Sequence, residues 1–454
     1  MQQHGTHATS HSSSQASSHA SSQASFLDEL TWRGLLHQTT SPELAAHLSS
    51  GVRAGYAGFD PTSDSLTIGN FMGIKLLAHL QRAGHRPIVV SGGGTGLIGD
   101  PSGKSAERTL LTRDLVEHNA KSQQRIFSRF LDFSGSRAAK IVNNVDWLSS
   151  MSYLDMLRDV GKHFSVNQMI ARDSVASRLE GREQGISYTE FSYMILQAYD
   201  FLHLYRAEKC TVQLGGSDQF GNIVSGIDLI RRLEQGESFG ATCPLVTTSD
   251  GQKIGKTEKG AIWLTADKTS PYRFYQYWLN TTDADAVKFL KWFTFLDHDA
   301  VQSLAHSLAQ DPSKREAQKS LAAEMTRMTH GETELARAIA TSEAIFSGDV
   351  KSLDAAQIAE IAADLPSSEV AAASLSAGVG IIDFITGTTC AASKREAREF
   401  VQNGAVSVNG EKVGADFVVR SEHALHVGKM GDKIGGVILL RRGKKAYHAV
   451  RVVQ

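Results

Sequence analysis

A loop at residues 253–257 carries side chains suited to phosphate chemistry. Its sequence, KIGKT, places two lysines and a hydroxyl around a glycine, shortly after the apolar residues 244–246. Ammonium and hydroxyl donors on a flexible backbone suit a polyphosphate. A single charged loop of this kind is more often a solvated surface feature. This pattern alone therefore leaves both interpretations open.

The segment 61–70 (PTSDSLTIGN) offers a second place for a phosphate. It lies where a predicted strand gives way to a helix, and the backbone N–H groups of a helix start attract anions. Gly69 has no side chain that would block a nucleotide lying close to the backbone. Taken alone, the segment is better explained as an ordinary helix start capped by Ser65 or Thr67.

A third polar group lies within the segment 188–200 (YTEFSYMILQAYD). At helical spacing, Tyr193, Gln197 and Asp200 share one face. Polar groups in an otherwise apolar helix are costly to bury unless they meet partners. A bound polar ligand would supply such partners, and an internal hydrogen-bond network would do so equally well.

The glycine-rich stretch from Gly92 to Gly103 matches two nucleotide-binding patterns only in part. Residues 94–99 (GTGLIG) fit the dinucleotide fingerprint, but Pro101 argues against the continuous helix on which a pyrophosphate would rest. Residues 103–105 (GKS) resemble the end of a P-loop, but that pattern requires a glycine where Ile98 stands. Neither a dinucleotide-dependent dehydrogenase nor a P-loop protein is favoured.

A strand–helix–strand pattern must position these polar segments. Residues 55–62 predict a short strand entering a turn, and an apolar-periodic helix follows through Phe71, Leu76 and Leu80, with Gly84 placed to end it. A buried strand at 87–90 comes next. This succession predicts a βαβ unit in a parallel sheet. Ligands of such sheets bind at the carboxyl ends of the strands, where these loops lie.

Length, charge and cysteine usage limit the classes of protein that fit. The 454 residues predict two or three folded domains, and the formal net charge of -1 excludes a uniformly basic nucleic-acid coat. Cys210, Cys243 and Cys390 form no CxxC pair, which excludes a disulfide framework and fits a reducing cytoplasm. No apolar run approaches the roughly 18 residues of a membrane span. The N-terminus also lacks the pattern of a secretory signal, so we expect a cytoplasmic protein without a membrane partner.

Together the motifs resemble those of the bacterial tyrosyl-tRNA synthetases, which are class I aminoacyl-tRNA synthetases. The resemblance runs from about Phe26 to the C-terminus. It rests on six segments in the same order and spacing, namely 56–62 (YAGFDPT), 92–104, 162–164 (KHF), 193–200, 215–219 (GGSDQ) and 253–257.

This resemblance implies an α/β protein of several parts, and the shifts in composition along the chain set the expected bounds. We expect a Rossmann-type catalytic domain with a parallel sheet, then an α-helical domain, then a small α+β RNA-binding domain. The expected parts are a disordered tail (1–25), the catalytic domain (26–245), a KMSKS-type loop and connector (246–270), the helical domain (271–347), a linker (348–376) and the RNA-binding domain (377–454).

Two positions depart from the family pattern. The HIGH motif stands here as residues 67–70 (TIGN), with Thr67 for the first histidine and Asn70 for the last. A threonine hydroxyl can still donate to a phosphate, with a shorter reach than imidazole. Phe220 follows GGSDQ, where the family commonly has Trp. This replacement keeps an aromatic ring but loses the indole N–H donor. We expect activity with weaker binding of ATP in the transition state.

The resemblance implies that the chain activates tyrosine with ATP and then loads it onto tRNA(Tyr). The tyrosine carboxylate attacks the α-phosphorus, so the protein positions the reactants and places positive charge around the leaving pyrophosphate. One Mg²⁺ would be held mainly by phosphate oxygens, with no dedicated protein metal site. The implied catalytic residues are Thr62, Thr67, Asn70, Lys104, Arg108, Lys253, Lys256 and Thr257. The implied ATP-binding residues are Asp60, Gly69, Gly216, Asp218 and Lys256.

The same resemblance implies a complete tyrosine pocket. Tyr56 and Asp200 would bind the phenol hydroxyl, and phenylalanine would leave both of them unpaired. The remaining implied contacts are Asp100, Tyr193 and Gln197 to the ammonium group and Gln219 to the carboxylate, with Asn144 and Gln213 as further candidates.

The C-terminal residues 393–410 resemble a small RNA-binding domain shared with a ribosomal protein and pseudouridine synthases. Residues 391–454 carry twelve Lys and Arg against six Asp and Glu, and clustering at the motif positions favours RNA binding over a merely solvated basic face. The family also implies a homodimer formed by the catalytic domains. The implied tRNA-binding residues are Lys394, Arg395, Arg398, Arg441, Arg442, Lys444 and Lys445.

Two rival functions remain open at this point. One is a synthetase for another amino acid, chiefly tryptophan, although Tyr56 with Asp200 favours a phenol and the basic C-terminal domain is unexpected in that relative. The other is an RNA-binding protein that has kept the fold and lost catalysis. Thr67 favours this second rival, whereas the loop at 253–257 and the amino-acid pocket oppose it.

Overall fold

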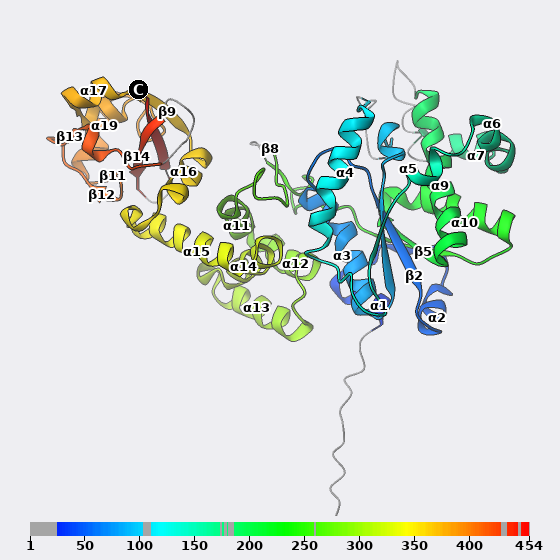
Figure 1. The fold of residues 1–454 in the computed structure, drawn as a ribbon. Helices are drawn as coiled ribbons and strands as arrows, with labels where there is room; N and C mark the ends of the chain where they lie inside the picture. Colours follow the sequence, from blue (N-terminus) through cyan, green and yellow to red (C-terminus); the bar gives the residue numbers. More distant parts are fainter. Residues whose placement is uncertain are drawn as a thin grey trace, which may run out of the picture.

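The computed structural model describes residues 25–102, 110–172, 175, 176, 179, 186–257, 260–427, 434–443 and 446–453. Figure 1 shows three consecutive parts: a sheet flanked by helices, a group of helices, and a smaller part with a second sheet that holds the C-terminus. No helix within the described ranges is long and apolar enough to cross a membrane.

The first sheet has six strands in the order β1-β6-β5-β2-β3-β4. Its five parallel strands are β2 (Ala54–Phe59), β3 (Arg86–Ser91), β4 (Lys140–Asn143), β5 (Cys210–Gly216) and β6 (Phe239–Cys243). The α/β prediction is confirmed, with one addition: β1 (Gln38–Thr39) pairs antiparallel with β6 at the edge. The chain order reverses between β2 and β5, which marks the place where such sheets bind ligands.

Helices cover both faces of this sheet, so its strands are buried on both sides. The principal helices are α3 (Ile68–Arg82), α4 (Arg113–Phe127), α9 (Tyr188–Glu208) and α10 (Phe220–Glu234). In β2, Ala57 and Phe59 belong to the core that contains α3, whereas Ala54 and Tyr56 belong to the core that contains α9 and α10. Burial on both faces explains the continuous apolar character of these strands.

The local signals around α3 are confirmed. The helix ends at Arg82, and Gly84 follows with a φ of 96°. The shorter elements of this part are α1 (Phe26–Arg33), α2 (Leu44–Ser49), α5 (Val145–Leu148), α6 (Tyr153–Asp155), α7 (Val166–Ile170), β7 (Lys256–Thr257), β8 (Gly260–Ala261), the turns of 3-10 helix η1 (Thr95–Leu97), η3 (Gly161–His163) and η4 (Ser217–Gln219), and the π-helical turn η2 (Met156–Val160).

The second part is helical and begins where Ser270 accepts a hydrogen bond from the Arg273 N–H. Its core is continuous with that of the sheet, because Phe293 stacks on Phe71 of α3 with ring centroids 6.3 Å apart. The buried Lys75 ammonium of α3 also donates to the Thr294 carbonyl at 2.9 Å. These helices are α11 (Pro271–Leu279), α12 (Asp283–Phe293), α13 (His298–Gln310), α14 (Glu316–His330) and α15 (Glu332–Ser347), with the short turn η5 (Pro312–Lys314).

The third part has its own core and a five-stranded sheet in the order β12-β11-β14-β15-β9. The α+β prediction for this end of the chain is confirmed. The five strands of this sheet are β9 (Ser367–Ala371), β11 (Val406–Val408), β12 (Glu411–Lys412), β14 (Ile434–Arg442) and β15 (Ala446–Val453). Two further strands, β10 (Val379–Gly380) and β13 (Val418–Val419), pair in a separate two-stranded sheet. Its helical segments are η6 (Val350–Ser352), α16 (Ala355–Asp364), α17 (Ala372–Ala377), α18 (Ile381–Ile385), α19 (Lys394–Gln402) and η7 (Ser421–His423).

Residues 348–376 differ from the linker that composition predicted. In α16, Ile358 and Ile361 pack with Val437 and Leu439 of β14 in one buried cluster. β9 runs parallel to β15 at the edge of the sheet. These residues are therefore part of the C-terminal fold. Their Ala-, Ser- and Asp-rich sequence hides this, because the strand's partner lies far along the chain.

Candidate active site

A cavity of about 580 Å³ opens at the carboxyl ends of β2 and β5. This volume is in the range of small-molecule sites. Segments far apart in the sequence meet around it, from the end of β2 to the loop that follows β6. Of the residues predicted for substrate or ATP, those that line it are Tyr56, Asp60, Thr62, Thr67, Gly69, Asn70, Asp100, Asn144, Tyr193, Gln197, Asp200, Gln213, Gly216, Asp218, Gln219 and Lys253.

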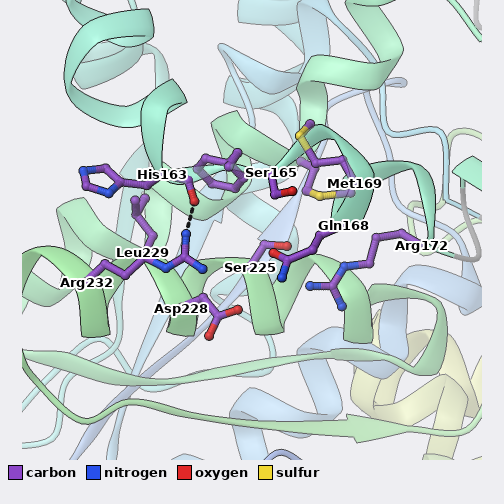
Figure 2. Close-up of a pocket in the computed structure, with 11 residues that line it drawn as sticks. His163, Ser165, Gln168, Met169, Arg172, Ser225, Asp228, Leu229 and Arg232 are labelled. Atoms are coloured by element: carbon purple, nitrogen blue, oxygen red, sulfur yellow. Dashed lines mark hydrogen bonds between the residues drawn. The ribbon is translucent and has the colours of Figure 1, made fainter.

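A second hollow between α7 and α10 is far smaller. Figure 2 shows its lining, in which the Arg232 guanidinium donates to the carbonyl oxygen of His163. Its volume of about 20 Å³ has room for about one water. His163 and Phe164 of the motif at 162–164 line this hollow.

One end of the large cavity carries a buried hydroxyl and a buried carboxyl. Tyr56 on β2 is 1% exposed and Asp200 on α9 is 3% exposed. Asp200 accepts hydrogen bonds from Trp147 Nε1 at 2.7 Å and Asn144 Nδ2 at 2.8 Å. The Tyr56 hydroxyl has no partner within the described part of the chain. This end therefore offers one donor and one acceptor to a ligand.

Burial dominates the electrostatics of this pair. Desolvation raises the pKa of Asp200 to about 7, although the bonds from Asn144 and Trp147 act in the opposite direction. Burial, reinforced by the charge of Asp200, raises the pKa of Tyr56 well above its usual value. The Tyr56 hydroxyl therefore keeps its proton and acts as a donor.

A chain of amide and carboxyl groups forms the adjoining wall. Asp100 accepts from Gln219 Nε2 at 2.8 Å, and Gln219 Oε1 accepts from Gln197 Nε2 at 3.2 Å. Asn222 Nδ2 donates to Gln197 Oε1 at 3.0 Å and to Gln219 Oε1 at 3.2 Å. These hydrogen bonds thus fix the positions of four loops and helices relative to one another. Within this chain of groups, Asp100 provides a carboxyl group suited to an ammonium ligand.

Asp60 joins the amino-acid side of the cavity to its phosphate side. Its carboxyl accepts from Tyr193 at 2.9 Å and from Thr95 Oγ1 at 2.7 Å. Thr95 in turn accepts from Asn144 Nδ2 at 2.9 Å. Tyr193, predicted for the ammonium group, is therefore hydrogen-bonded to a residue predicted for ATP.

The start of α3 faces the cavity with small polar groups. Thr67 precedes the helix in extended conformation, and its N–H and hydroxyl both donate to Asn70 Oδ1, at 3.0 and 2.8 Å. A later segment pairs alongside: Leu264 N–H donates to Leu66 O at 2.8 Å, and Lys268 Nζ lies 2.7 Å from Asp64 Oδ1.

The loop at 253–257 reaches the same helix start. Gly255 has a φ of 74°, and a Cβ built on it would lie 3.3 Å from Ile68 Cβ. The Gly255 N–H donates to the Tyr277 hydroxyl at 3.0 Å, and its carbonyl accepts from Ile262 at 2.8 Å. The two segments that the sequence singled out for phosphate are therefore in contact. The side chains of Lys256 and Thr257 lie outside the described residues.

The wall formed by β5 and the loop after β6 is suited to a nucleoside. Gly216 and Asp218 line it together with Cys243 and Leu245. Desolvation, followed by the charge of Asp100, raises the pKa of Asp218. Lys104 and Arg108, also predicted for ATP, lie outside the described residues.

The basic groups of the C-terminal part divide into two sets. Lys394, Arg395 and Arg398 lie exposed on α19, while Ala397 and Val401 of the same helix are buried. Arg441 instead donates to the carbonyl oxygen of Phe346 at 3.1 Å, and Arg442 lies over the Phe400 ring at 4.5 Å. Lys444 and Lys445 lie outside the described residues.

Comparison with known families identifies this arrangement. The family described as tRNA synthetases class I (W and Y) matches residues 52–347. The family described as the tyrosine--tRNA ligase SYY-like C-terminal domain matches residues 357–450. The chain belongs to the class I tRNA synthetases of this W and Y family. The second match includes α16 and β9, in agreement with their place in the C-terminal fold.

Individual relatives of this class I synthetase span nearly its whole length. The tyrosine--tRNA ligase of Bacillus caldotenax is 49% identical over 431 residues, which cover 94% of this chain and 99% of that one. That of Staphylococcus carnosus is 50% identical over 428 residues, 94% of this chain and 98% of that one. A C-terminally truncated mitochondrial tyrosyl-tRNA synthetase of Aspergillus nidulans superimposes with a TM-score of 0.65 at 29% identity, over 71% of this chain and 94% of that one.

Three residues of the synthetase site were missed in the sequence. Trp147 binds Asp200, Thr95 binds Asp60, and Asn222 links Gln197 to Gln219. Asn222 had a signal, because it lies three residues after Gln219 at helical spacing. Trp147 had a similar signal, because it lies three residues after Asn144. Thr95 had none, since its contact with Asp60 arises only when two loops meet.

Proposed function

We propose that this chain is a tyrosine--tRNA ligase, which activates L-tyrosine with ATP and transfers it to the 3′ end of tRNA(Tyr). The observation that carries the proposal is the paired donor and acceptor of Tyr56 and Asp200, buried in the same cavity as the phosphate-facing segments. The relatives described as tyrosine--tRNA ligases support it over 94% of the chain.

The geometry of the pair favours tyrosine over its two nearest rivals. A phenol can donate its proton to Asp200 and accept a hydrogen bond from Tyr56. Tryptophan's indole N–H could donate to Asp200 but has no acceptor for Tyr56, and phenylalanine satisfies neither. Each buried group left unpaired costs about 1–3 kcal/mol.

The opposite end of the amino acid would meet the polar wall. Its ammonium group lies near Asp100, Tyr193 and Gln197, and its carboxylate near Gln219. Because Gln219 is held by both Asp100 and Asn222, the carboxylate is kept at a fixed distance from the phosphate side.

The first reaction needs no nucleophile from the protein. The tyrosine carboxylate oxygen bonds to the α-phosphorus, the bond to the β,γ-pyrophosphate breaks, and tyrosyl-adenylate and pyrophosphate form. Rate enhancement then comes from positioning and from positive charge around the leaving group. The proposed groups for this are Thr62, Thr67, Asn70 and Lys253, which line the cavity. Lys104, Arg108, Lys256 and Thr257 keep the roles that the resemblance implies.

We assign the divalent cation to the substrate. ATP would bring one Mg²⁺ bound by its own phosphates. The phosphate oxygens would supply most of its ligands. Among the described residues, no group of three His, Cys, Asp or Glu side chains is placed to hold a metal ion.

A homodimer is the proposed assembly. Five large apolar side chains are exposed on neighbouring segments of the catalytic part: Tyr153 (64%), Leu154 (75%), Val166 (57%), Ile170 (42%) and Tyr188 (60%). An apolar area of this kind on a soluble enzyme marks an interaction surface, and a second copy of the chain is the proposed occupant.

The transfer step requires tRNA, for which α19 supplies the proposed contact through Lys394, Arg395 and Arg398. The cysteines Cys210, Cys243 and Cys390 are free and buried. Free thiols support a location in the reducing cytoplasm, where tRNA is charged.

Pyrophosphate exchange with the purified full chain tests the proposal. We expect exchange that depends on tyrosine, with phenylalanine and tryptophan far less effective, and loss of that preference in Asp200→Ala. Faster exchange with tryptophan would assign the chain to the other branch of its family. Binding of tRNA with no exchange for any amino acid would identify a synthetase-like RNA-binding protein instead.

A further inference from the structure

Thr67 directs both of its hydrogen-bond donors at a single atom. Its backbone N–H lies 3.0 Å from Asn70 Oδ1, and its hydroxyl oxygen lies 2.8 Å from the same atom. A backbone N–H can only donate, so the amide atom facing it must be the oxygen. The orientation of the Asn70 amide is therefore fixed by its neighbour.

The consequence for Asn70 is a free pair of donors beside the cavity. Within the described part of the chain, Asn70 Nδ2 makes no hydrogen bond. Thr67, Gly69 and Asn70 all line the cavity. The two N–H bonds of Nδ2 are thus available to an anionic ligand at the start of α3, where the helix also favours negative charge.

The hydroxyl of Thr67, in contrast, already uses its donor within the protein. A threonine hydroxyl has one hydrogen, and here that hydrogen points at Asn70. Donating it to a phosphate would break one of the two hydrogen bonds that orient Asn70, the other being that from the Thr67 backbone N–H. A substrate oxygen could accept a hydrogen bond either from the Thr67 hydroxyl or from Nδ2 of an oriented Asn70. The observed hydrogen bonds from Thr67 to Asn70 Oδ1 correspond to the second arrangement.

The backbone at Thr67 is held firmly enough for this role. Ile68 N–H donates to Ile262 O at 3.2 Å, Leu264 N–H donates to Leu66 O at 2.8 Å, and Thr67 itself forms a β-bridge with Trp263. Because these bonds already fix the backbone on both sides of Thr67, Thr67 loses little further conformational entropy when it orients Asn70.

We propose that Thr67 is a positioning residue, which holds the Asn70 amide so that Nδ2 donates to the triphosphate of ATP. Thr67 makes no direct bond to the phosphates, and Asn70 supplies the donor at this motif. This inference rests on the proposed function, because it concerns the ATP used in tyrosine activation.

A double-mutant cycle in tyrosine-dependent pyrophosphate exchange tests it. Asn70→Ala removes the donor to a charged oxygen, so kcat falls by about 10–100-fold. Thr67→Val keeps the shape and removes the hydroxyl, so kcat falls by about 3–10-fold with the KM for tyrosine unchanged. The double variant is expected to be no slower than Asn70→Ala, because a positioning residue has nothing left to position.

Two further variants complete the test. Thr67→Ser keeps the hydroxyl and restores the rate of exchange. Thr265→Val removes a hydroxyl of the adjoining segment, which donates to Ser65 Oγ at 2.9 Å, and should leave exchange unchanged. Thermal midpoints within about 2 °C of the wild type show that the variants are folded.

Independent, multiplicative losses in the double variant would overturn the inference and make Thr67 a direct donor. A wild-type rate in Thr67→Val would overturn it as well. Both results leave the proposed function intact. That function fails on different results, namely no exchange with tyrosine or faster exchange with tryptophan in the wild-type chain.

Discussion

Asp200 is a deeply buried carboxyl group with a raised pKa. It is 3% exposed and accepts hydrogen bonds from Asn144 and Trp147, yet burial still raises its pKa to about 7. Two neutral donors do not replace the hydration that a charged group loses on burial. The carboxyl therefore holds a proton across much of the acidic range.

We expect Asp200 to make the ligand-free protein less stable as the pH rises. Its folded pKa lies above the usual value of 3.8, so the native state binds more protons than the unfolded state between the two. The contribution is fully present below about pH 3.8 and is lost as the pH passes 7. Its limiting slope is about 1.4 kcal/mol per pH unit.

Urea unfolding at pH 5 and pH 8 measures this effect. Asp200→Asn is the matched control, because it keeps the shape and cannot titrate. The wild type should lose more stability than the control between these two values. An identical pH dependence in both proteins would show that Asp200 is already ionised at pH 5.

Tyr56→Phe should separate binding from stability. The Tyr56 hydroxyl is buried without a partner, so its removal should leave the thermal midpoint unchanged or slightly higher. Tyrosine loses one hydrogen bond in the variant, and its KM should rise by about 2–13-fold. Selection against phenylalanine should weaken in the same exchange assay. A variant with an unchanged KM would place the phenol away from β2.

At this scale the sequence predicted which residues meet but not how they bond. Tyr56, Gln197 and Asp200 were placed together through their motifs, and the cavity contains all three. Trp147 was missed although it lies three residues after Asn144, and Thr95 was missed because its contact with Asp60 arises only when two loops meet. The competition between Asn70 Oδ1 and a phosphate for the single hydroxyl hydrogen of Thr67 also depends on coordinates that a motif does not contain.

Among the elements, the end of α15 shows how the C-terminal part is joined to the helices before it. The last carbonyl groups of a helix lack partners within it. Here Arg441 donates to Phe346 O at 3.1 Å, and the Tyr447 hydroxyl donates to Ile345 O at 3.3 Å. Arg441 therefore caps the C-terminal end of α15 from the C-terminal part. Its guanidinium also lies over the Tyr447 ring.

The salt dependence of tRNA binding distinguishes this cap from a phosphate contact. Each cation that neutralises a phosphate contributes about one unit to the slope of log affinity against log salt. We expect Arg395→Ala and Arg398→Ala, on the exposed face of α19, each to reduce the slope by about one unit. Arg441→Ala should weaken binding at an unchanged slope, because it loosens the joint. A reduced slope in Arg441→Ala would return this residue to the RNA-binding surface.

Elements with strong local signals were predicted well, and the others were not. The periodic α3 and the apolar β3 carry their own patterns. β1 has two residues and β9 has five, and each depends on a partner far along the chain. Pairing between distant segments leaves no periodicity to detect, which is why one edge strand was missed and one was assigned to a linker.

For the whole molecule, the fold moves the boundary of the C-terminal part, which is the proposed boundary between amino-acid activation and tRNA binding. Composition placed it near residue 375, but α16 and β9 contribute to the C-terminal core and sheet. The class I match ends at residue 347 and the C-terminal match begins at 357. The junction therefore lies at the end of α15, near Gly348.

Two truncations test this boundary. A chain that ends at Gly348 keeps the complete cavity and the core shared by α3 and the helices α11 to α15, so pyrophosphate exchange should stay within about 2-fold of the wild type. Without α19 its rate of tRNA charging should fall by about 10-fold or more at physiological salt. A chain that ends at Leu375 would keep α16 and β9 without the strands that cover them.

The longer fragment, which ends at Leu375, should aggregate more readily than the fragment that ends at Gly348. Its Ile358 and Ile361 lose Val437 and Leu439, and β9 loses β15, its neighbour in the sheet. Exposed apolar groups and an unpaired strand favour association between chains, so we expect aggregation on gel filtration although exchange survives. A soluble, well-folded longer fragment would show that residues 349–375 do not need the C-terminal sheet, and full tRNA charging by the shorter fragment would remove the C-terminal part from the reaction.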